Sequence, residues 1–329
     1  MPANLPPQYF TAEKSFRLAK RPEEKIAALE EMLAIMPKHK GTDHLRAELR
    51  GRIAKLTQLA TKKSGAHRVS MAIEKEGAAQ VAVIGSPNAG KSQLVTSITN
   101  ASPTVAEYPF TTQTTTPGMM EFENIQIQLI DTPPLAPPSI EWWLRHILIR
   151  ADALLVIVDL DDTPLTQMEA ITAQLGKIRI SLNKRKAEEP SVILYQKKAL
   201  IIGNKLDLDN ASKNYKVLRN RYEEQLPVIA ISAKEGIGLE ELKREIYQIL
   251  NIIRVYTKTP RQKPDFNDPI VLKRGSTLGD AAAAVHKDFA NKLKYARIWG
   301  SGKHDGLMAK RAHILQDGDV IELHLLSLL

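Results

Sequence analysis

The sequence predicts an α/β protein whose central part is a mostly parallel sheet. Between Ala79 and Leu250, short apolar runs alternate with amphipathic segments, a pattern typical of strands joined by helices. A glycine-rich loop follows the first apolar run, at the end of a strand where such sheets bind ligands. The first 75 residues have a helical pattern instead, and the chain is long enough for two or three domains.

The predicted strands are short runs of apolar residues, as expected for strands that are covered on both faces. They are Val81–Ile84, Ile125–Ile130, Ala153–Val158, Ala199–Ile202 and Val228–Ile231. Glu121–Phe122 is expected to begin an edge strand that pairs with the third of these. Helices are expected after the glycine-rich loop, Ile140, Leu165, Ala211 and Leu239, and Lys184–Ser191 is predicted to be a charged surface connection.

The glycine-rich loop matches the phosphate-binding pattern G-x-x-x-x-G-K-[ST] at every position. It consists of Gly85, Ser86, Pro87, Asn88, Ala89, Gly90, Lys91 and Ser92. Its glycines let successive backbone N–H groups converge on phosphate oxygens, at the N-terminus of a helix that attracts anions. Lys91 would add a positive charge near the β- and γ-phosphates, and the Ser92 hydroxyl would ligate Mg2+. The alternative is a glycine turn that binds nothing.

Two further segments supply groups for Mg2+. The loop Phe110–Gly118 carries several threonines, and one of their hydroxyls is expected to complete the Mg2+ shell when a γ-phosphate is present. The residues alone do not distinguish Thr111, Thr112 and Thr114 in this role. Asp131 comes directly after a predicted strand, where a carboxylate can hold Mg2+ directly or through water.

Two motifs after the later strands select the base. In the first, Asn204, Lys205 and Asp207, the Asp207 carboxylate can accept from both N1–H and the exocyclic amine of guanine, a donor pair that adenine lacks. The Lys205 stem would lie along the base, and Asn204 would tie the loop to its neighbours. The second motif consists of Ser232, Ala233 and Lys234, and its Ala233 N–H is expected to donate to guanine O6. Five motifs in this order predict binding of GTP and GDP.

Composition narrows the class of protein and of partner. The 329 residues carry a net charge of +9, which suggests an anionic partner such as nucleic acid, although the excess can also serve solubility alone. There is no cysteine, so disulfides, thiolate metal sites and cysteine nucleophiles are excluded. No signal-peptide pattern and no apolar run of membrane-spanning length is present, so we expect a cytoplasmic protein without a membrane partner.

Both flanks of the central region carry candidate RNA-binding groups. Residues 1–75 are predicted to form a basic helical hairpin, with helices over 26–36 and 45–60 joined by Lys38–Gly41. This hairpin is a candidate arm for RNA, and a merely solvated helix face is the alternative. In the C-terminal region, basic and aromatic residues are mixed between 287 and 304, which suits RNA. Trp299 and Phe289 are expected to be core residues, which leaves the lysines as the candidate surface.

Residues 79–250 resemble the translation-factor-related GTPases of the Obg and developmentally regulated GTP-binding (DRG) group. The run Ala106–Thr112, followed by Pro117-Gly118, is similar to the first switch of DRG proteins. Ile253–Lys258 and the segments around Gly275, Trp299 and Asp317 resemble their C-terminal TGS domain, a small β-grasp module. The resemblance implies a basic helical N-terminal region (1–75), a P-loop GTPase domain (76–252), a connector (253–265) and a TGS domain (266–329).

An activity is implied by the same resemblance. It implies a cytoplasmic Mg2+-dependent GTPase that acts near RNA or ribosomes. The family pattern places Mg2+ on Ser92 and on the second threonine of Phe-Thr-Thr, here Thr112, beside Asp131. Lys91 and Thr112 would then be the catalytic residues.

Three features depart from the family's pattern or from that of related GTPases. The family's Asp-x-x-Gly is here Asp131-Thr132-Pro133-Pro134, and Pro134 has no N–H to give to the γ-phosphate. Leu135 stands where Ras-like enzymes place a water-orienting glutamine, although DRG and Obg proteins are also apolar there. The chain between Asp159 and Ala199 is too short for the inserted domain of eukaryotic DRG proteins, which suggests a bacterial or otherwise reduced relative.

Two hypotheses about function follow. The first is a switch on the ribosome or another RNA assembly that hydrolyses GTP to GDP and phosphate, slowly without a protein activator. K+ is a candidate aid, because GTPases that use K+ in place of an arginine finger resemble this sequence in having asparagine at the position of Asn88. A conformational role for that asparagine is the alternative. The second hypothesis is a GTP-binding RNA or ribosome adaptor with little or no hydrolysis, because Pro134 replaces the glycine of the second switch.

Overall fold

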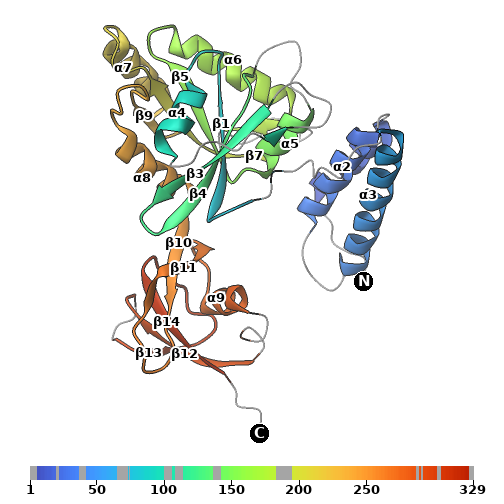
Figure 1. Ribbon diagram of the computed structural model, residues 1–329, viewed down its shortest axis with the longest axis vertical. Helices are drawn as coiled ribbons and strands as arrows, with labels where there is room; N and C mark the ends of the chain where they lie inside the picture. The colour runs from blue at the N-terminus through green and yellow to red at the C-terminus, as the bar shows by residue number, and fades with distance from the viewer. Residues whose placement is uncertain are drawn as a thin grey trace.

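The computed structural model of the chain has three parts in sequence order: a group of helices, a domain built on a seven-stranded sheet and a smaller domain built on a five-stranded sheet (Figure 1). It describes residues 6–19, 22–36, 42–64, 73, 75–99, 106–107, 114–135, 142–182, 195–286, 289, 292–301 and 305–325. The expected connection at Lys184–Ser191 and the loop residues Thr111 and Thr112 lie outside the described residues.

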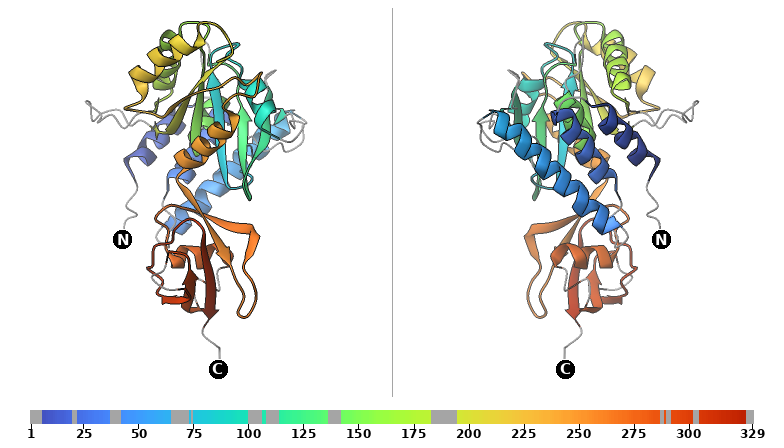
Figure 2. Two further views of the ribbon diagram at one scale, coloured as in Figure 1. Left: turned by 90° about the vertical axis from the view of Figure 1, so that its left-hand side faces the viewer. Right: turned by 90° about the vertical axis from the view of Figure 1, so that its right-hand side faces the viewer.

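Three helices are described in the N-terminal region, where the sequence analysis expected two. Helix α1 (Pro7–Leu18) precedes α2 (Pro22–Ile35) and α3 (Asp43–Ser64). Tyr9 and Ala12 of α1 are buried against apolar residues of the other two helices, so all three share one small core. The helices lie to one side of the domain with the seven-stranded sheet in Figure 1, and they pass in front of it in the right-hand view of Figure 2.

The seven-stranded sheet has the order β2-β3-β4-β1-β5-β8-β9. Its strands are β1 (Ala79–Gly85), β2 (Ala106–Glu107), β3 (Thr114–Phe122), β4 (Ile125–Asp131), β5 (Ala153–Asp159), β8 (Lys198–Asn204) and β9 (Val228–Ala230). The five predicted strands correspond to β1, β4, β5, β8 and β9, which run parallel. The prediction for Glu121–Phe122 is wrong in three respects: these residues end β3 and do not begin it, β3 pairs antiparallel with β4 and not with the strand at 153–158, and β2 pairs with its other side, so β3 is not an edge strand. A two-residue turn joins β3 and β4, and antiparallel neighbours need no longer connection.

Helices cover both faces of this sheet, which buries its parallel strands. Apolar side chains of α5 (Trp142–Arg150), α6 (Pro164–Lys177) and α7 (Ala211–Tyr222) form the core on one face. Those of α4 (Lys91–Ile98) and α8 (Leu239–Leu250) form the core on the other face. A separate two-stranded ribbon is made by β6 (Ile180–Ser181) and β7 (Tyr195–Gln196).

The C-terminal domain has a five-stranded sheet of order β11-β10-β14-β12-β13 and one helix, α9 (Leu278–Val285). Its strands are β10 (Ile252–Thr257), β11 (Asp265–Lys273), β12 (Leu293–Trp299), β13 (Leu307–Ala309) and β14 (Asp319–Leu325). Residues 253–257, which the sequence places in a connector, therefore form a strand of this sheet, paired with both β11 and β14.

Trp299 differs from its expected place in the core, whereas Phe289 packs against the C-terminal core as expected. Ala296 and Ile298 of β12 are buried, so Trp299 points to the opposite face of the sheet. There the Lys258 ammonium lies 4.0 Å from the centre of its ring. The alternation of side chains along β12 decides on which face of the sheet Trp299 lies. This alternation is not clear in the sequence, because residues 296–299 are too short a stretch to show it.

Candidate functional site

The phosphate loop connects β1 to α4. Its two glycines stand where a side chain would collide with a neighbouring atom or strain the backbone. A Cβ at Gly85 would lie 2.4 Å from the Ile157 carbonyl oxygen of the neighbouring strand β5. Gly90 has a φ of +91°, in the left-handed region that glycine adopts without strain. Asn88 also has a positive φ, of 60°, which asparagine tolerates better than most residues. The loop thus has the tight glycine turn that the motif predicts.

Lys91, the first residue of α4, is held inside the loop. Its ammonium donates hydrogen bonds to the carbonyl oxygens of Ser86, at 2.9 Å, and Gly85, at 3.3 Å. Burial lowers the pKa of Lys91, while the nearby Asp131 carboxylate partly offsets this effect. The side chain is only 7% exposed, so its charge would act in a partly desolvated site, where electrostatic interactions are stronger.

Ser92 and Asp131, two of the three predicted Mg2+ ligands, lie together. The Ser92 hydroxyl donates to one Asp131 carboxylate oxygen, at 2.5 Å. The other carboxylate oxygen is buried and has no hydrogen-bond partner among the described residues. Burial raises the pKa of Asp131, which the Ser92 hydrogen bond and Lys91 partly counteract. An unpartnered buried carboxylate oxygen next to a hydroxyl fits a hard cation with oxygen ligands such as Mg2+.

The third predicted ligand, Thr112, lies outside the described residues. The structure does locate the strand that follows it, because β3 begins at Thr114 and Thr116 of β3 pairs with Asp131 of β4. Residues 114–118, which were expected to belong to a loop, are therefore part of β3, and the strand passes directly beside the Asp131 backbone.

Asn204 joins the phosphate loop to the second base-selecting motif. Its side-chain amide donates to the Ala89 carbonyl oxygen at 2.9 Å, and its side-chain oxygen accepts from the Ala233 N–H at 3.0 Å. This is the tie that the sequence analysis assigned to Asn204. The Ala233 N–H, however, was expected to face guanine O6, and here it already has an acceptor. A guanine oxygen would have to share that amide with Asn204.

The other two residues of the first base motif are also held by neighbours. The Asp207 carboxylate accepts from the Ser232 hydroxyl at 2.6 Å, and this hydrogen bond lowers the pKa of Asp207. An ionised carboxylate is the acceptor that the guanine donor pair requires. Lys205, with a φ of +69°, forms an ion pair with Asp159 at the end of β5. Sequence reasoning missed Asp159, and its only signal is its place at the carboxyl end of a predicted strand.

The second switch begins in the site and then enters the core. Pro133 and Pro134 line a cleft of about 520 Å3 together with Lys91, Ser92 and Asp131. The next residue, Leu135, is only 7% exposed and belongs to the core beneath α5. The side chain at the position of the Ras-like glutamine is therefore packed away from the cleft.

Two family models match parts of the chain. One, described as 50S ribosome-binding GTPase, matches residues 80–197, and the other, the TGS domain, matches residues 253–325. The second match begins within β10, in agreement with the pairing of that strand. No helix of the described ranges has both the length and the apolar character needed to cross a membrane.

Curated relatives match nearly the whole chain. An uncharacterized GTP-binding protein of Methanocaldococcus jannaschii is 30% identical over 362 positions, which cover 92% of each chain. Developmentally-regulated GTP-binding protein 1 of Xenopus laevis is 28% identical, and ribosome-interacting GTPase 1 of Saccharomyces cerevisiae is 27% identical; each alignment covers 91% of this chain and 98% of the relative. A solved GTP binding protein from Pyrococcus horikoshii, 17% identical, has a TM-score of 0.52 and covers 75% of this chain and 100% of its own, which supports the fold.

Proposed function

Because this chain belongs to the developmentally regulated GTP-binding (DRG) family of GTPases, we propose that it hydrolyses GTP to GDP and phosphate with Mg2+ and acts as a switch on the ribosome or another RNA assembly. The observation that carries the proposal is the meeting of three groups at one edge of the sheet. These are the phosphate loop, the Ser92–Asp131 pair and the two base loops that Asn204 connects. Carboxyl ends of parallel strands meet at one edge, which is where α/β sheets bind ligands.

Each group has a defined part in the proposed reaction. Water attacks the γ-phosphorus, the bond to the bridging oxygen breaks, and the products are GDP and phosphate. The loop amides and Lys91 stabilise the charge that develops on the phosphate oxygens. Ser92, Asp131 and Thr112 would hold the metal, and Mg2+ when bound neutralises charge between the β- and γ-phosphates. Asp207 selects the base.

Two residues of the second switch favour the competing function, a GTP-binding adaptor with little or no hydrolysis. Pro134 lines the cleft but cannot donate an N–H to a γ-phosphate. Leu135 is buried in the core and cannot orient water. Hydrolysis would therefore depend on other groups, such as a protein activator or K+ near Asn88. The positive φ of Asn88 supports a conformational role equally well.

The partner is inferred from the family's names and from charge. The matching family is described as ribosome-binding, and one relative is named a ribosome-interacting GTPase. Residues 1–75 hold 15 lysines and arginines against 8 aspartates and glutamates, and residues 253–329 hold 13 against 8, whereas residues 76–252 hold 18 against 21. The basic excess thus lies in the two flanking regions and favours an RNA partner for them.

In the C-terminal domain, one face of the sheet has the chemistry to hold RNA. Tyr295, Arg297 and Trp299 alternate with buried residues along β12, and Arg297 is exposed. Tyr295 stacks on His324 of β14, with ring centres 4.5 Å apart. Aromatic rings for stacking beside cations for phosphates are typical of single-stranded RNA recognition.

Turnover is the decisive measurement. Purified protein with verified GTP binding is assayed for phosphate release with Mg2+ in KCl and in matched NaCl, with and without ribosomes. Turnover supports the GTPase. If K+ stimulates turnover and Asn88→Ala abolishes the stimulation, K+ acts near Asn88. No turnover under any of these conditions, with GTP bound, refutes a GTPase that works alone or with ribosomes and favours the adaptor over an enzyme that needs a further protein activator.

RNA binding is tested separately with the full chain. Arg297→Glu is expected to weaken binding to ribosomal RNA and to reduce its salt dependence, because it removes a phosphate contact. Lys213→Glu, which makes the same charge change at an exposed position on α7, is the control. Equal effects of the two variants would contradict the assignment of the β12 face.

A further inference from the structure

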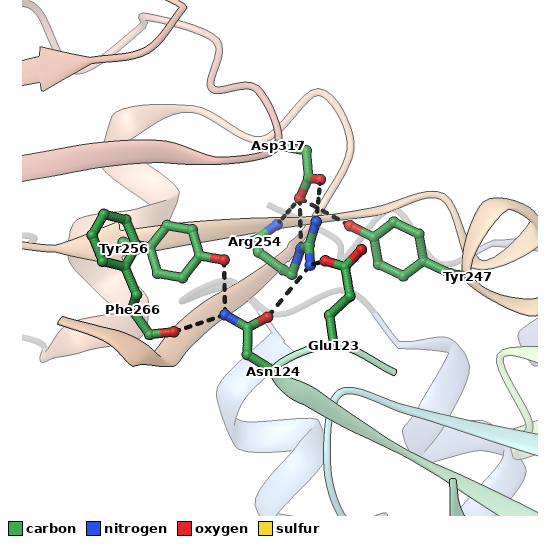
Figure 3. A network of polar contacts seen from close by, with 7 residues as sticks. All are labelled: Glu123, Asn124, Tyr247, Arg254, Tyr256, Phe266 and Asp317. Atoms are coloured by element: carbon green, nitrogen blue, oxygen red, sulfur yellow. Dashed lines mark hydrogen bonds and ion pairs between the residues drawn. The ribbon is translucent and has the colours of Figure 1, made fainter. Parts of the chain in front are cut away.

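The turn between β3 and β4 is fixed to the C-terminal domain by a network of polar contacts (Figure 3). Arg254 of β10 lies at its centre, with a side chain that is 12% exposed. Its guanidinium pairs with the Glu123 carboxylate on the turn and with the Asp317 carboxylate, the latter at 2.8 Å. The ring of Tyr247, from α8, lies 5.2 Å from the guanidinium, and its hydroxyl donates to Asp317 at 2.9 Å.

Asn124, the second residue of the turn, is bound to the same domain. Its side-chain amide donates to the Tyr256 hydroxyl and to the Phe266 carbonyl oxygen, both at 2.8 Å, and its side-chain oxygen accepts from Arg254 at 3.4 Å. Both residues of this two-residue turn therefore form polar contacts with the C-terminal domain.

The backbone of the turn is unusual as well. Glu123 has a φ of +50°, a left-handed conformation that is uncommon for a residue other than glycine. Its side chain is 58% exposed, so no burial of Glu123 compensates for the conformation. Two-residue hairpin turns favour a positive φ at their first position, and the contacts of the turn with the C-terminal domain hold a residue other than glycine in that conformation.

The other end of the same hairpin lies in the nucleotide site. The register pairs Phe122 with Ile125 next to the turn and Thr116 with Asp131 at the far end. Asp131 contacts Ser92 there, and β3 begins within the threonine-rich segment 110–118. If one strand slipped by one residue along the other, its buried side chains would turn to the opposite face of the sheet. Because that slip is unfavourable, the two strands of the hairpin are expected to move together. A displacement of the hairpin at the metal-binding end would therefore reach the turn.

We propose that the β3–β4 hairpin couples the guanine-nucleotide site to the C-terminal domain, with Arg254 as the positioning residue that fixes the turn. The proposal rests on guanine-nucleotide binding at this site and not on hydrolysis or ribosome contact. Coupling is reciprocal by linkage. The bound nucleotide changes the orientation of the C-terminal domain, and a partner that reorients this domain changes the nucleotide affinity by the same factor.

The lack of cysteine allows the orientation to be measured with site-specific labels. Cysteines replace Val217 on α7, 44% exposed, and Met308 on β13, 62% exposed, and each carries a spin label. The distance distribution between the labels is measured for the full chain with GDP and with a non-hydrolysable GTP analogue, both with Mg2+. The dissociation rate of a fluorescent GDP is measured on the same protein.

Arg254→Ala tests the role of the network, and Arg244→Ala, at an exposed arginine on α8, is its matched control. In the unaltered chain, we expect different distance distributions with the two nucleotides. Arg254→Ala should abolish that difference and change the GDP dissociation rate about fivefold or more, within the usual range of coupling between sites. The control should retain both properties. If Arg254→Ala does not fold, Glu123→Ala removes one contact at an exposed side chain and is expected to act in the same direction.

Two results would overturn the proposal. One is an identical distance distribution with both nucleotides in the unaltered chain. The other is an unchanged GDP dissociation rate in an Arg254→Ala protein whose distance distribution has broadened. The network would then hold the two domains together without affecting nucleotide binding. Equilibrium binding of fluorescent GDP is measured first: a chain that does not bind it overturns the proposed function as well, whereas binding without coupling overturns this proposal alone.

Discussion

Substitution of Gly90 by alanine is expected to lower the free energy of unfolding, because the added Cβ has no room in the nucleotide site. A Cβ at Gly90 would lie 2.3 Å from the Asn204 side-chain nitrogen, and the φ of +91° would be strained for alanine. The strain costs ~1–2 kcal/mol. Moving the Asn204 amide breaks its hydrogen bonds with Ala89 and Ala233, which are worth ~1 kcal/mol each. Gly90→Ala is therefore expected to lower the free energy of unfolding by ~3–4 kcal/mol.

Gly236→Ala is the matched control, because Gly236 has a φ of +74° but no atom within 4 Å of the added Cβ. It should lose only the ~1–2 kcal/mol of backbone strain. Urea denaturation followed by circular dichroism measures both losses, and fluorescent GDP titration measures affinity. Gly90→Ala should also bind GDP more weakly, since Asn204 connects the phosphate loop to the base loop. Equal stability losses in the two variants would refute the steric reasoning.

Three further predictions concern the base, the metal and pH. Asp207→Asn should shift preference from guanine to xanthine nucleotides in competition binding, because an amide can donate where the carboxylate accepts; an unchanged GTP preference would contradict the assignment. Asp131→Asn should weaken nucleotide binding ~10-fold or more with Mg2+ but little in EDTA, and equal losses in both would argue against a metal ligand. Burial lowers the pKa of His146 to about 4 from 6.5, so the unfolded chain binds the extra proton between these values and stability falls as pH decreases through them. This effect amounts to ~3 kcal/mol at most, and His146→Gln should lack it in unfolding measured from pH 7 to 4.5; an unaltered pH dependence would count against it.

The central fold and the chemistry of the phosphate loop could be predicted without a structure. Both are local patterns: runs of apolar residues specify buried strands, and a loop with glycines at fixed spacing specifies a turn that aims N–H groups at anions. The motif after each strand could be placed at one edge of the sheet because parallel strands share their carboxyl ends. Ser92 and Asp131 could therefore be assigned to one metal although they are far apart in the chain.

The neighbours of these residues, in contrast, follow only from the packing of the folded chain. The pairing of Lys205 with Asp159, the use of the Ala233 N–H by Asn204 and the burial of Leu135 depend on packing between segments that no local pattern relates. The same holds for Arg254 and Glu123, which are 131 positions apart in the chain and in contact across two domains. Local propensity sets the conformation of each segment. The contacts between segments depend on how their buried faces pack together, and no local pattern in a single sequence specifies that packing.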